Sequence, residues 1–211
     1  MTIVVTGASR GIGAGLVEAY RTSGADVVGT TRGGAAAVDV SDPASVHAFA
    51  EGLKDRPVSL LVCNAGVYLD KGHRIGAGYS AEVWAKSFAT NVTGVFLMVE
   101  ALLPNLRGGH GKIAIISSQM GSSERAPGGS YVYRASKAAA LNLGRNLAAD
   151  LAADGVAVGI YHPGWVRTDM GSYAAEISVA QSVTGLMARF EALSMASTGE
   201  FLTWDERVHP Y

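Results

Sequence analysis

The chain has 211 residues, of which 48% are hydrophobic and 17% charged, and its formal net charge is -1. This length suits one domain, residues 1–211, built around a large core. The composition excludes a disordered chain and a coiled coil, and the balanced charge offers no basic field for a nucleic acid or an anionic membrane. We therefore expect a globular protein that binds neither nucleic acid nor membrane.

The single cysteine, Cys63, indicates the compartment. It cannot form an internal disulfide, and one cysteine cannot build a cysteine-based metal cluster. Residues 1–6 lack the basic and apolar regions of a secretory signal, and no run of eighteen apolar residues occurs. We expect a cytoplasmic protein without a bound metal, in which Cys63 is a buried hydrophobic residue rather than a nucleophile.

Short β-branched runs alternate with Ala-rich helical stretches from one end of the chain to the other. The predicted strands cover residues 3–5, 26–28, 60–62, 113–116 and 156–160. The predicted helices cover residues 14–23, 44–53, about 81–93 and about 131–153. Apolar runs without period-two alternation suit strands that helices cover on both faces. The pattern predicts a single-domain α/β Rossmann fold, a doubly wound parallel sheet of about seven strands.

A glycine-rich turn follows the first predicted strand and opens the first predicted helix. Its glycines allow a tight turn and close approach of a pyrophosphate, while the helix N-terminus supplies free N–H groups. The residues of this turn that we expect to bind the cofactor are Gly7, Ser9, Arg10, Gly11, Ile12 and Gly13. An ordinary glycine-rich turn is the alternative when the motif is considered alone.

The residue after the second strand of such folds selects between NAD and NADP, because it lies beside the adenosine ribose. Arg32 stands there, and the nearest carboxylates, Asp26 and Asp39, lie before the strand and well after it. Arg32 and Arg10 could together bind a 2′-phosphate. The sequence therefore favours NADP(H), with NAD(H) as the second candidate, although either arginine alone could be a solvated turn residue.

Tyr133 and Lys137 are four residues apart, on one face of the helix predicted there. A phenol keeps its proton up to a pH of about 10. The charge of Lys137, with that of an oxidised nicotinamide, could lower this pKa and make Tyr133 a general acid. Ser118 follows a predicted strand, where its hydroxyl could hydrogen-bond a carbonyl oxygen. The Tyr–Lys spacing also occurs in surface helices, so the argument rests on the three residues together.

With these motifs, the chain resembles the classical short-chain dehydrogenase/reductase family over nearly its whole length. Further motifs that carry the resemblance are Asn64-Ala65-Gly66, Asn91 in Asn-Val-Thr-Gly, and Pro163-Gly164 followed by Thr168. Residues 162–171 and 199–205 are most similar to the compact branch of C-factor and sniffer-type carbonyl reductases.

The resemblance implies a catalytic tetrad of Asn91, Ser118, Tyr133 and Lys137. Tyr133 would donate a proton, Ser118 would orient and polarise the carbonyl, and hydride would pass from the nicotinamide to the carbonyl carbon. Lys137 would lower the tyrosine pKa and hold the nicotinamide ribose, and Asn91 would keep a water in a proton relay. The other implied cofactor-binding residues are Asp39 and Val40 at the adenine, Asn64, Ala65 and Gly66 beside the cofactor, and Pro163, Gly164, Val166 and Thr168, the last two at the carboxamide.

The segment after Pro163-Gly164 is shorter than in many classical members. A short lid predicts an open site for bulky or aromatic carbonyl compounds. The residues expected to contact the substrate are Val67, Met120, Trp165 and Tyr173. The apolar segments 81–103 and 131–153 suggest contacts between subunits, and we expect a homodimer or homotetramer.

Two functions of different classes remain at this point. The first is an NADPH-dependent oxidoreductase, a carbonyl reductase or alcohol dehydrogenase of EC 1.1.1 type, acting on a ketone or aldehyde. The alternative is a dinucleotide-binding signalling or regulatory protein of C-factor type with little catalytic activity. An intact tetrad favours the enzyme, because a protein that only binds has no need of a proton donor.

Overall fold

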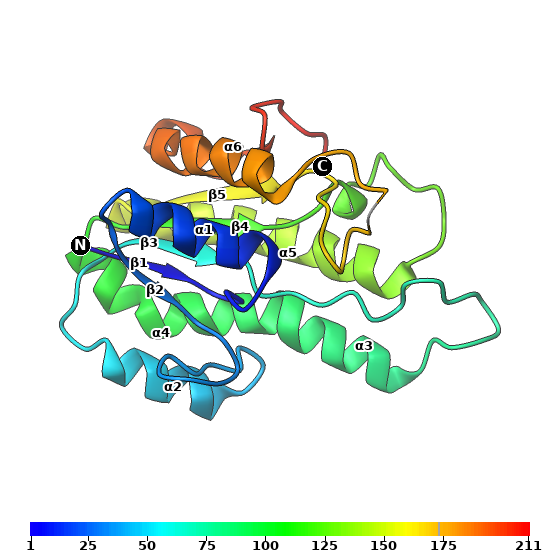
Figure 1. Ribbon diagram of the computed structural model, residues 1–211, viewed down its shortest axis with the longest axis horizontal. Coiled ribbons are helices and arrows are strands. Elements are labelled where there is room, and N and C mark those ends of the chain that lie inside the picture. Colours follow the sequence, from blue (N-terminus) through cyan, green and yellow to red (C-terminus); the bar gives the residue numbers. More distant parts are fainter. Residues whose placement is uncertain (173) are drawn as a thin grey trace.

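The computed structural model describes residues 1–172 and 174–211 and confirms the α/β Rossmann fold (Figure 1). Among these residues, six strands form one parallel sheet in the order β2-β1-β3-β4-β5-β6. The strands are β1 (Thr2–Val5), β2 (Asp26–Gly29), β3 (Val58–Cys63), β4 (Lys112–Ile116), β5 (Ala157–His162) and β6 (Phe201–Thr203).

Helices cover both faces of this sheet, as Figure 1 shows. The helices are α1 (Gly11–Thr22), α2 (Pro43–Gly52), α3 (Ala81–Phe88), α4 (Gly94–Gly108), α5 (Tyr131–Asp150) and α6 (Val179–Ala192). In β3, Leu61 and Cys63 join the core under α2, α4 and α5, while Leu60 and Val62 join the core under α1 and α6. Because alternate residues point to opposite apolar layers, the strands show continuous apolar runs.

The expected count of about seven strands is wrong by one, and the difference lies at the β2 edge. Beyond β2, residues 32–36 form a short loop, and a single parallel bridge joins Thr31 to Ala37. Five residues cannot contain a crossover helix, and parallel strands need a crossover of a dozen or more residues. A further edge strand is therefore reduced to this bridge, with Val38 buried just after it.

The helix predicted at about 81–93 is longer than expected. A π-helical turn, Ala89–Thr93, joins α3 to α4, so the helical segment continues to Gly108. These 28 residues are long and apolar enough to cross a membrane by length and composition alone. Met98 and Leu102 of α4 are nonetheless fully buried against the sheet, and a core helix passes the same test.

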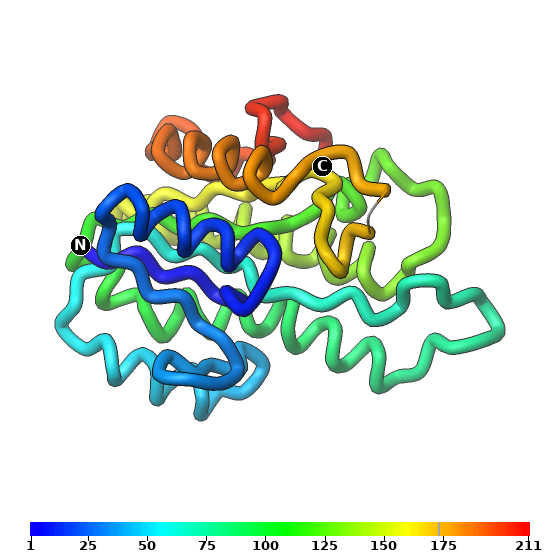
Figure 2. The backbone as a smooth tube through the Cα atoms, in the orientation of Figure 1, coloured from blue at the N-terminus to red at the C-terminus, as the bar shows by residue number. Residues whose placement is uncertain are grey.

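The carboxyl ends of the strands all face one end of the molecule, because the sheet is parallel. The loops 66–80 and 122–130, together with residues 163–172 and 174–178, gather at that end (Figure 2). The strand order reverses between β1 and β3, and in doubly wound folds ligands bind outside the carboxyl ends at this point. The fold thus places the glycine-rich turn after β1 next to residues 64–66 after β3.

We expect Leu102→Ala to destabilise the protein by about 2–5 kcal/mol, because the buried side chain would leave a cavity under the sheet. Ile75→Ala is the control, since Ile75 is 76% exposed and its loss should cost less than about 0.5 kcal/mol. Urea denaturation measures both values. Equal midpoints for the two variants would contradict the assigned core.

Candidate active site

The glycine-rich turn is packed too tightly for side chains at two of its positions. Gly7 has φ +67°, and a Cβ there would lie 2.7 Å from the Cα of Ala65. A Cβ on Gly13 would lie 2.4 Å from the carbonyl oxygen of Gly7 and 2.5 Å from Nδ2 of Asn64. Asn64 in turn donates hydrogen bonds to the carbonyl oxygens of Thr6 (2.9 Å) and Gly7 (3.2 Å). The segments after β1 and β3 therefore form one rigid edge.

This edge fits a dinucleotide. Helix α1 begins at Gly11, and within the described residues its N-cap, Arg10, makes no side-chain cap hydrogen bond. The first N–H groups of α1 are thus available to a pyrophosphate, which the positive end of the helix dipole also favours. A Cβ on Gly11 would lie 3.2 Å from Cγ2 of Thr168, so the turn also contacts the segment after β5.

The two arginines considered for a 2′-phosphate have different neighbours. Arg10 forms an exposed ion pair of 2.9 Å with Asp169, which closes the glycine-rich turn onto the segment after β5. Arg32 is exposed beyond β2 and faces Asp39. Hydrogen bonds from Ser41 hold the pKa of Asp39 below its usual range, and the charge of Arg32 adds to this effect. Among the described side chains, Arg32 forms no ion pair, unlike Arg10.

Several other expected cofactor residues line the same edge. Ser9 is exposed in the turn and Ile12 is half-buried in α1, while Val40 is buried against Gly94. After β5, Gly164 adopts φ +89°, which favours glycine, and Val166 is buried beside it. Thr168 hydrogen-bonds the N–H of Gly171 and so shapes the loop that follows Pro163.

Tyr133, Lys137 and Ser118 lie together at the carboxyl end of β4, as predicted from the sequence. All three are buried, with exposures of 8%, 5% and 7%. The amine of Lys137 lies 5.8 Å from the centre of the Tyr133 ring and donates a 2.8 Å hydrogen bond to the carbonyl oxygen of Ile116. The hydroxyl of Ser118 accepts the N–H of Met120 (3.1 Å), which leaves its hydrogen for another acceptor.

Burial controls the protonation of this group. It raises the pKa of Tyr133 to about 12, while a hydrogen bond with the Ser118 hydroxyl acts in the opposite direction. Burial lowers the pKa of Lys137 to about 8. The phenol therefore keeps its proton at neutral pH, and the amine is still largely protonated there.

A chain of close contacts connects the catalytic group to the cofactor edge. A Cβ on Gly66 would lie 3.3 Å from Oδ1 of Asn91 and 3.5 Å from the amine of Lys137. The glycine at this position thus lets the segment after β3 lie directly against both side chains. Asn64, Ala65 and Gly66 consequently border the turn on one side and the catalytic group on the other.

Asn91 is fully buried in the π-helical turn, and its side-chain amide hydrogen-bonds two other parts of the chain. Oδ1 accepts the N–H of Val67 (2.8 Å), and Nδ2 donates to the carbonyl oxygen of Val67 (2.9 Å) and to Oγ of Ser136 (2.9 Å). Both amide hydrogens are therefore used within the protein. The sequence could not predict these hydrogen bonds, because they depend on Val67 lying against the π-helical turn that carries Asn91.

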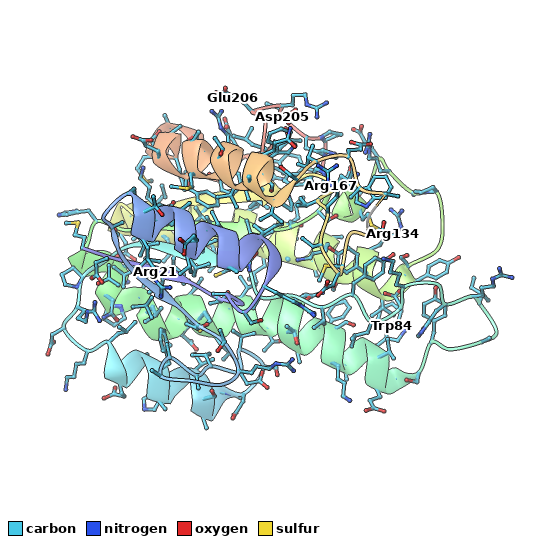
Figure 3. The ribbon with its side chains drawn as sticks, in the orientation of Figure 1. Arg21, Trp84, Arg134, Arg167, Asp205 and Glu206 are labelled. Carbon is cyan, nitrogen blue, oxygen red and sulfur yellow. The ribbon has the colours of Figure 1, made fainter. Side chains whose placement is uncertain are left out.

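Of the expected substrate residues, Val67 and Met120 are half-buried beside the catalytic group. Trp165 is 43% exposed, and its indole N–H donates to the carbonyl oxygen of Gly171. Tyr173 lies outside the described residues. Arg134, labelled in Figure 3, points toward this end of the molecule and holds the neighbouring loop through the carbonyl oxygen of Arg125 (3.0 Å).

Two residues beside Tyr133 were not predicted from the sequence. The ring of Tyr68 stacks on that of Tyr133, with centroids 4.2 Å apart, and the buried carboxylate of Asp70 accepts the N–H groups of Val132 and Tyr133. Neither has a motif of its own. The sequence gives no hint of Asp70 as the cap either, because Ser130 at the N-cap is itself a common capping residue and only the structure shows that, among the described residues, its side chain does not cap α5.

The fold and this edge define a Rossmann protein that binds a nicotinamide dinucleotide next to a Ser–Tyr–Lys group. Comparison with known proteins agrees. The model of the short chain dehydrogenase family matches residues 34–177. The C-signal protein of Myxococcus xanthus is 34% identical over 168 residues, which are 79% of this chain and 100% of that protein.

Solved structures give the same result. The NADPH-bound carbonyl reductase from chicken fatty liver matches with a TM-score of 0.90 and 29% identity, over 100% of this chain and 98% of that one. The carbonyl reductase Sniffer of D. melanogaster matches with a TM-score of 0.93 and 25% identity, over 100% and 99%. The chain belongs to the short-chain dehydrogenase/reductase family of oxidoreductases, whose members act on small molecules, and it resembles the C-factor and sniffer-type branch.

We expect Gly13→Ala to weaken NADPH binding about tenfold or more, because the added Cβ would push apart the backbone of Gly7 and the amide of Asn64. Gly52→Ala is the matched control, since a Cβ there meets nothing within 4 Å. Fluorescence titration with NADPH measures both. Equal affinities in the two variants would show that the turn does not bind the cofactor.

Proposed function

We propose that the protein is an NADPH-dependent carbonyl reductase that converts a ketone or aldehyde to an alcohol. The observation that carries the proposal is the buried group of Ser118, Tyr133 and Lys137 at the carboxyl end of β4, joined through Gly66 to the glycine-rich turn. The similarity to an NADPH-bound carbonyl reductase supports it. A binding protein would not require a buried proton donor there.

In the proposed reaction, Ser118 and Tyr133 act on the carbonyl oxygen of the substrate. When bound, NADPH supplies the hydride that reaches the carbonyl carbon. Ser118 holds the carbonyl oxygen through its hydroxyl hydrogen, and the phenol of Tyr133 gives its proton to that oxygen as negative charge develops there. The raised pKa of Tyr133 keeps the phenol protonated before the reaction, which suits an acid in the reductive direction.

Lys137 acts on the product of that proton transfer, and the turn that carries Asn91 holds the relay water. The ammonium of Lys137, 5.8 Å from the Tyr133 ring, stabilises the phenolate that remains and holds the nicotinamide ribose. The Asn91 side chain has no hydrogen to spare for a relay water. A π-helical turn interrupts the regular helical hydrogen bonds, so we assign the water to a backbone carbonyl of Ala89–Thr93.

The cofactor preference rests on Arg32. Its exposed guanidinium lies just beyond β2, where the fold family places the adenosine ribose. Arg10 contributes less, because Asp169 already binds its guanidinium. We propose NADP(H) as the preferred cofactor on this basis, with NAD(H) bound more weakly.

The substrate and the assembly follow from the surface around the site. The half-buried Val67 and Met120 with the exposed Trp165 suit a bulky or aromatic carbonyl compound.

Trp84 and Phe96, on α3 and α4, are 37% and 42% exposed, and their apolar rings support a homodimer or homotetramer through these helices. We also propose a cytoplasmic location, which suits the free thiol of Cys63.

We expect Tyr133→Phe to lower turnover by roughly 10²–10⁴-fold, because the proton donor is lost while the ring remains. NADPH affinity should be unchanged. Tyr131→Phe is the matched control, two residues earlier on the exposed side of α5, and should keep full turnover. NADPH oxidation by a panel of ketones, aldehydes and quinones measures all three proteins. NADPH binding without turnover in the wild type would favour a regulatory protein, as the similarity to C-signal suggests.

We expect Arg32→Asp to weaken NADPH binding roughly tenfold to a hundredfold relative to NADH, because a charge-assisted hydrogen bond to the 2′-phosphate is lost. Arg21→Asp makes the same change in charge at the far end of α1, away from the loops of the site (Figure 3). It should leave the ratio of the two affinities unchanged. An unaltered ratio in Arg32→Asp would refute the phosphate assignment.

A further inference from the structure

Residues 67–70 lie across the beginning of α5, the helix that carries Tyr133. We propose that Tyr68 and Asp70 are positioning residues for Tyr133, in which Asp70 fixes the first turn of α5 and Tyr68 covers the phenol ring. This inference rests on the proposed function, since it concerns the geometry of the proton donor. Neither residue belongs to the tetrad or to the cofactor edge.

Asp70 provides the cap that α5 lacks locally. Its side chain is fully buried, and its two carboxylate oxygens accept the N–H groups of Val132 (2.9 Å) and Tyr133 (3.2 Å). Ser130 stands at the N-cap with φ 51°, and among the described residues it makes no side-chain cap hydrogen bond. The acceptor therefore comes from 62 and 63 residues earlier in the chain. The helix dipole and these two bonds offset the cost of burying the carboxylate.

Tyr68 covers one face of the Tyr133 ring. The rings of Tyr68 and Tyr133 are stacked with an interplanar angle of 21°. The hydroxyl of Tyr68 hydrogen-bonds Oγ of Ser130, one residue before α5. The Tyr68 ring therefore keeps a fixed place relative to α5, and it removes water from one face of the phenol.

Asn91 fixes the segment that carries both residues. Its amide binds the N–H and the carbonyl oxygen of Val67, directly before Tyr68. The same amide donates to Ser136, whose hydroxyl donates to the carbonyl oxygen of Tyr133. The position of the phenol is thus determined jointly by the π-helical turn, by residues 67–70 and by α5. This arrangement gives Asn91 a positioning part in addition to the relay proposed for its turn.

The same residues influence the charge state of the phenol. Tyr68 and Asp70 of this segment act on its pKa, and Lys137 of α5 lies 5.8 Å from the centre of its ring. After burial, which is the largest effect, Asp70 and Tyr68 both raise the pKa of Tyr133. A neutral residue at position 70 should therefore lower that pKa, because a nearby negative charge opposes formation of the phenolate. A residue with a purely structural role would not produce this shift.

The test compares Asp70→Asn and Asp70→Ala with Asp42→Asn. Asp42 caps α2 through the N–H of Ala44 (3.0 Å), so its replacement makes the same chemical change at another helix. Asparagine keeps an acceptor for α5 but removes the charge, whereas alanine removes both. Thermal denaturation and NADPH titration first establish that each variant folds and binds the cofactor.

The first readout does not require turnover. In protein labelled with ¹³C at the ζ carbon of tyrosine, the Tyr133 signal is identified by its loss in Tyr133→Phe. We expect it to begin titrating at a lower pH in Asp70→Asn than in the wild type or Asp42→Asn, with and without NADP+. An unmoved titration in Asp70→Asn would overturn the electrostatic role of Asp70.

The second readout is steady-state reduction of a carbonyl substrate as a function of pH. We expect kcat to fall roughly tenfold to a hundredfold in Asp70→Ala, with partial recovery in Asp70→Asn and little change in the KM for NADPH. Tyr68→Leu should lower kcat, while Tyr68→Phe, which keeps the stacked ring, should retain most of it. Unchanged kcat in Asp70→Ala and Tyr68→Leu would overturn the positioning role. Failure of the wild type to reduce any carbonyl, together with the NMR shift in Asp70→Asn, would refute the reductase and leave the placement of the phenol supported.

Discussion

The contact between β4 and α5 is the interaction on which the site depends. The amine of Lys137 binds the carbonyl oxygen of Ile116 at the end of β4, and the hydroxyl of Ser117 donates to the carbonyl oxygen of Lys137. A Cβ on Gly121 would lie 2.7 Å from the carbonyl carbon of Lys137, so only glycine lets the turn after Ser118 lie against α5. These contacts bring the serine hydroxyl, the phenol and the amine together at the carboxyl end of β4.

Exclusion of water gives this contact its chemical effect. Burial makes both ionised forms unfavourable, so the pKa of the phenol rises to about 12 while that of the amine falls to about 8. The Ser118 hydroxyl favours the phenolate, and the carboxylate of Asp70 opposes it. The protein therefore holds a protonated acid next to a group that can stabilise its conjugate base. A bound nicotinamide ring would add its own charge to this balance.

The sequence predicted the layers and most of the elements because local patterns specify them. Apolar runs identified β1 to β5, and the turn residues 7–13 and Asn64 to Gly66 were found where the structure places them. The expected total of about seven strands was too high by one, because the loop 32–36 is too short for a crossover and, among the described residues, only a single bridge lies beyond β2. The full length of the α3–α4 helical segment was also missed, since its π-helical turn interrupts the apolar period.

Residue types at fixed local spacings were enough to indicate the family and the parallel fold, and to mark Ser118, Tyr133 and Lys137 as candidate catalytic residues. Three contacts became apparent only in the folded chain: the Asn91 amide binds Val67, Asp169 binds Arg10, and Asp70 caps α5. Each of these contacts joins residues 24 to 159 positions apart. Such pairings are set by where the sheet brings the loops together, and no local pattern in the chain contains that information.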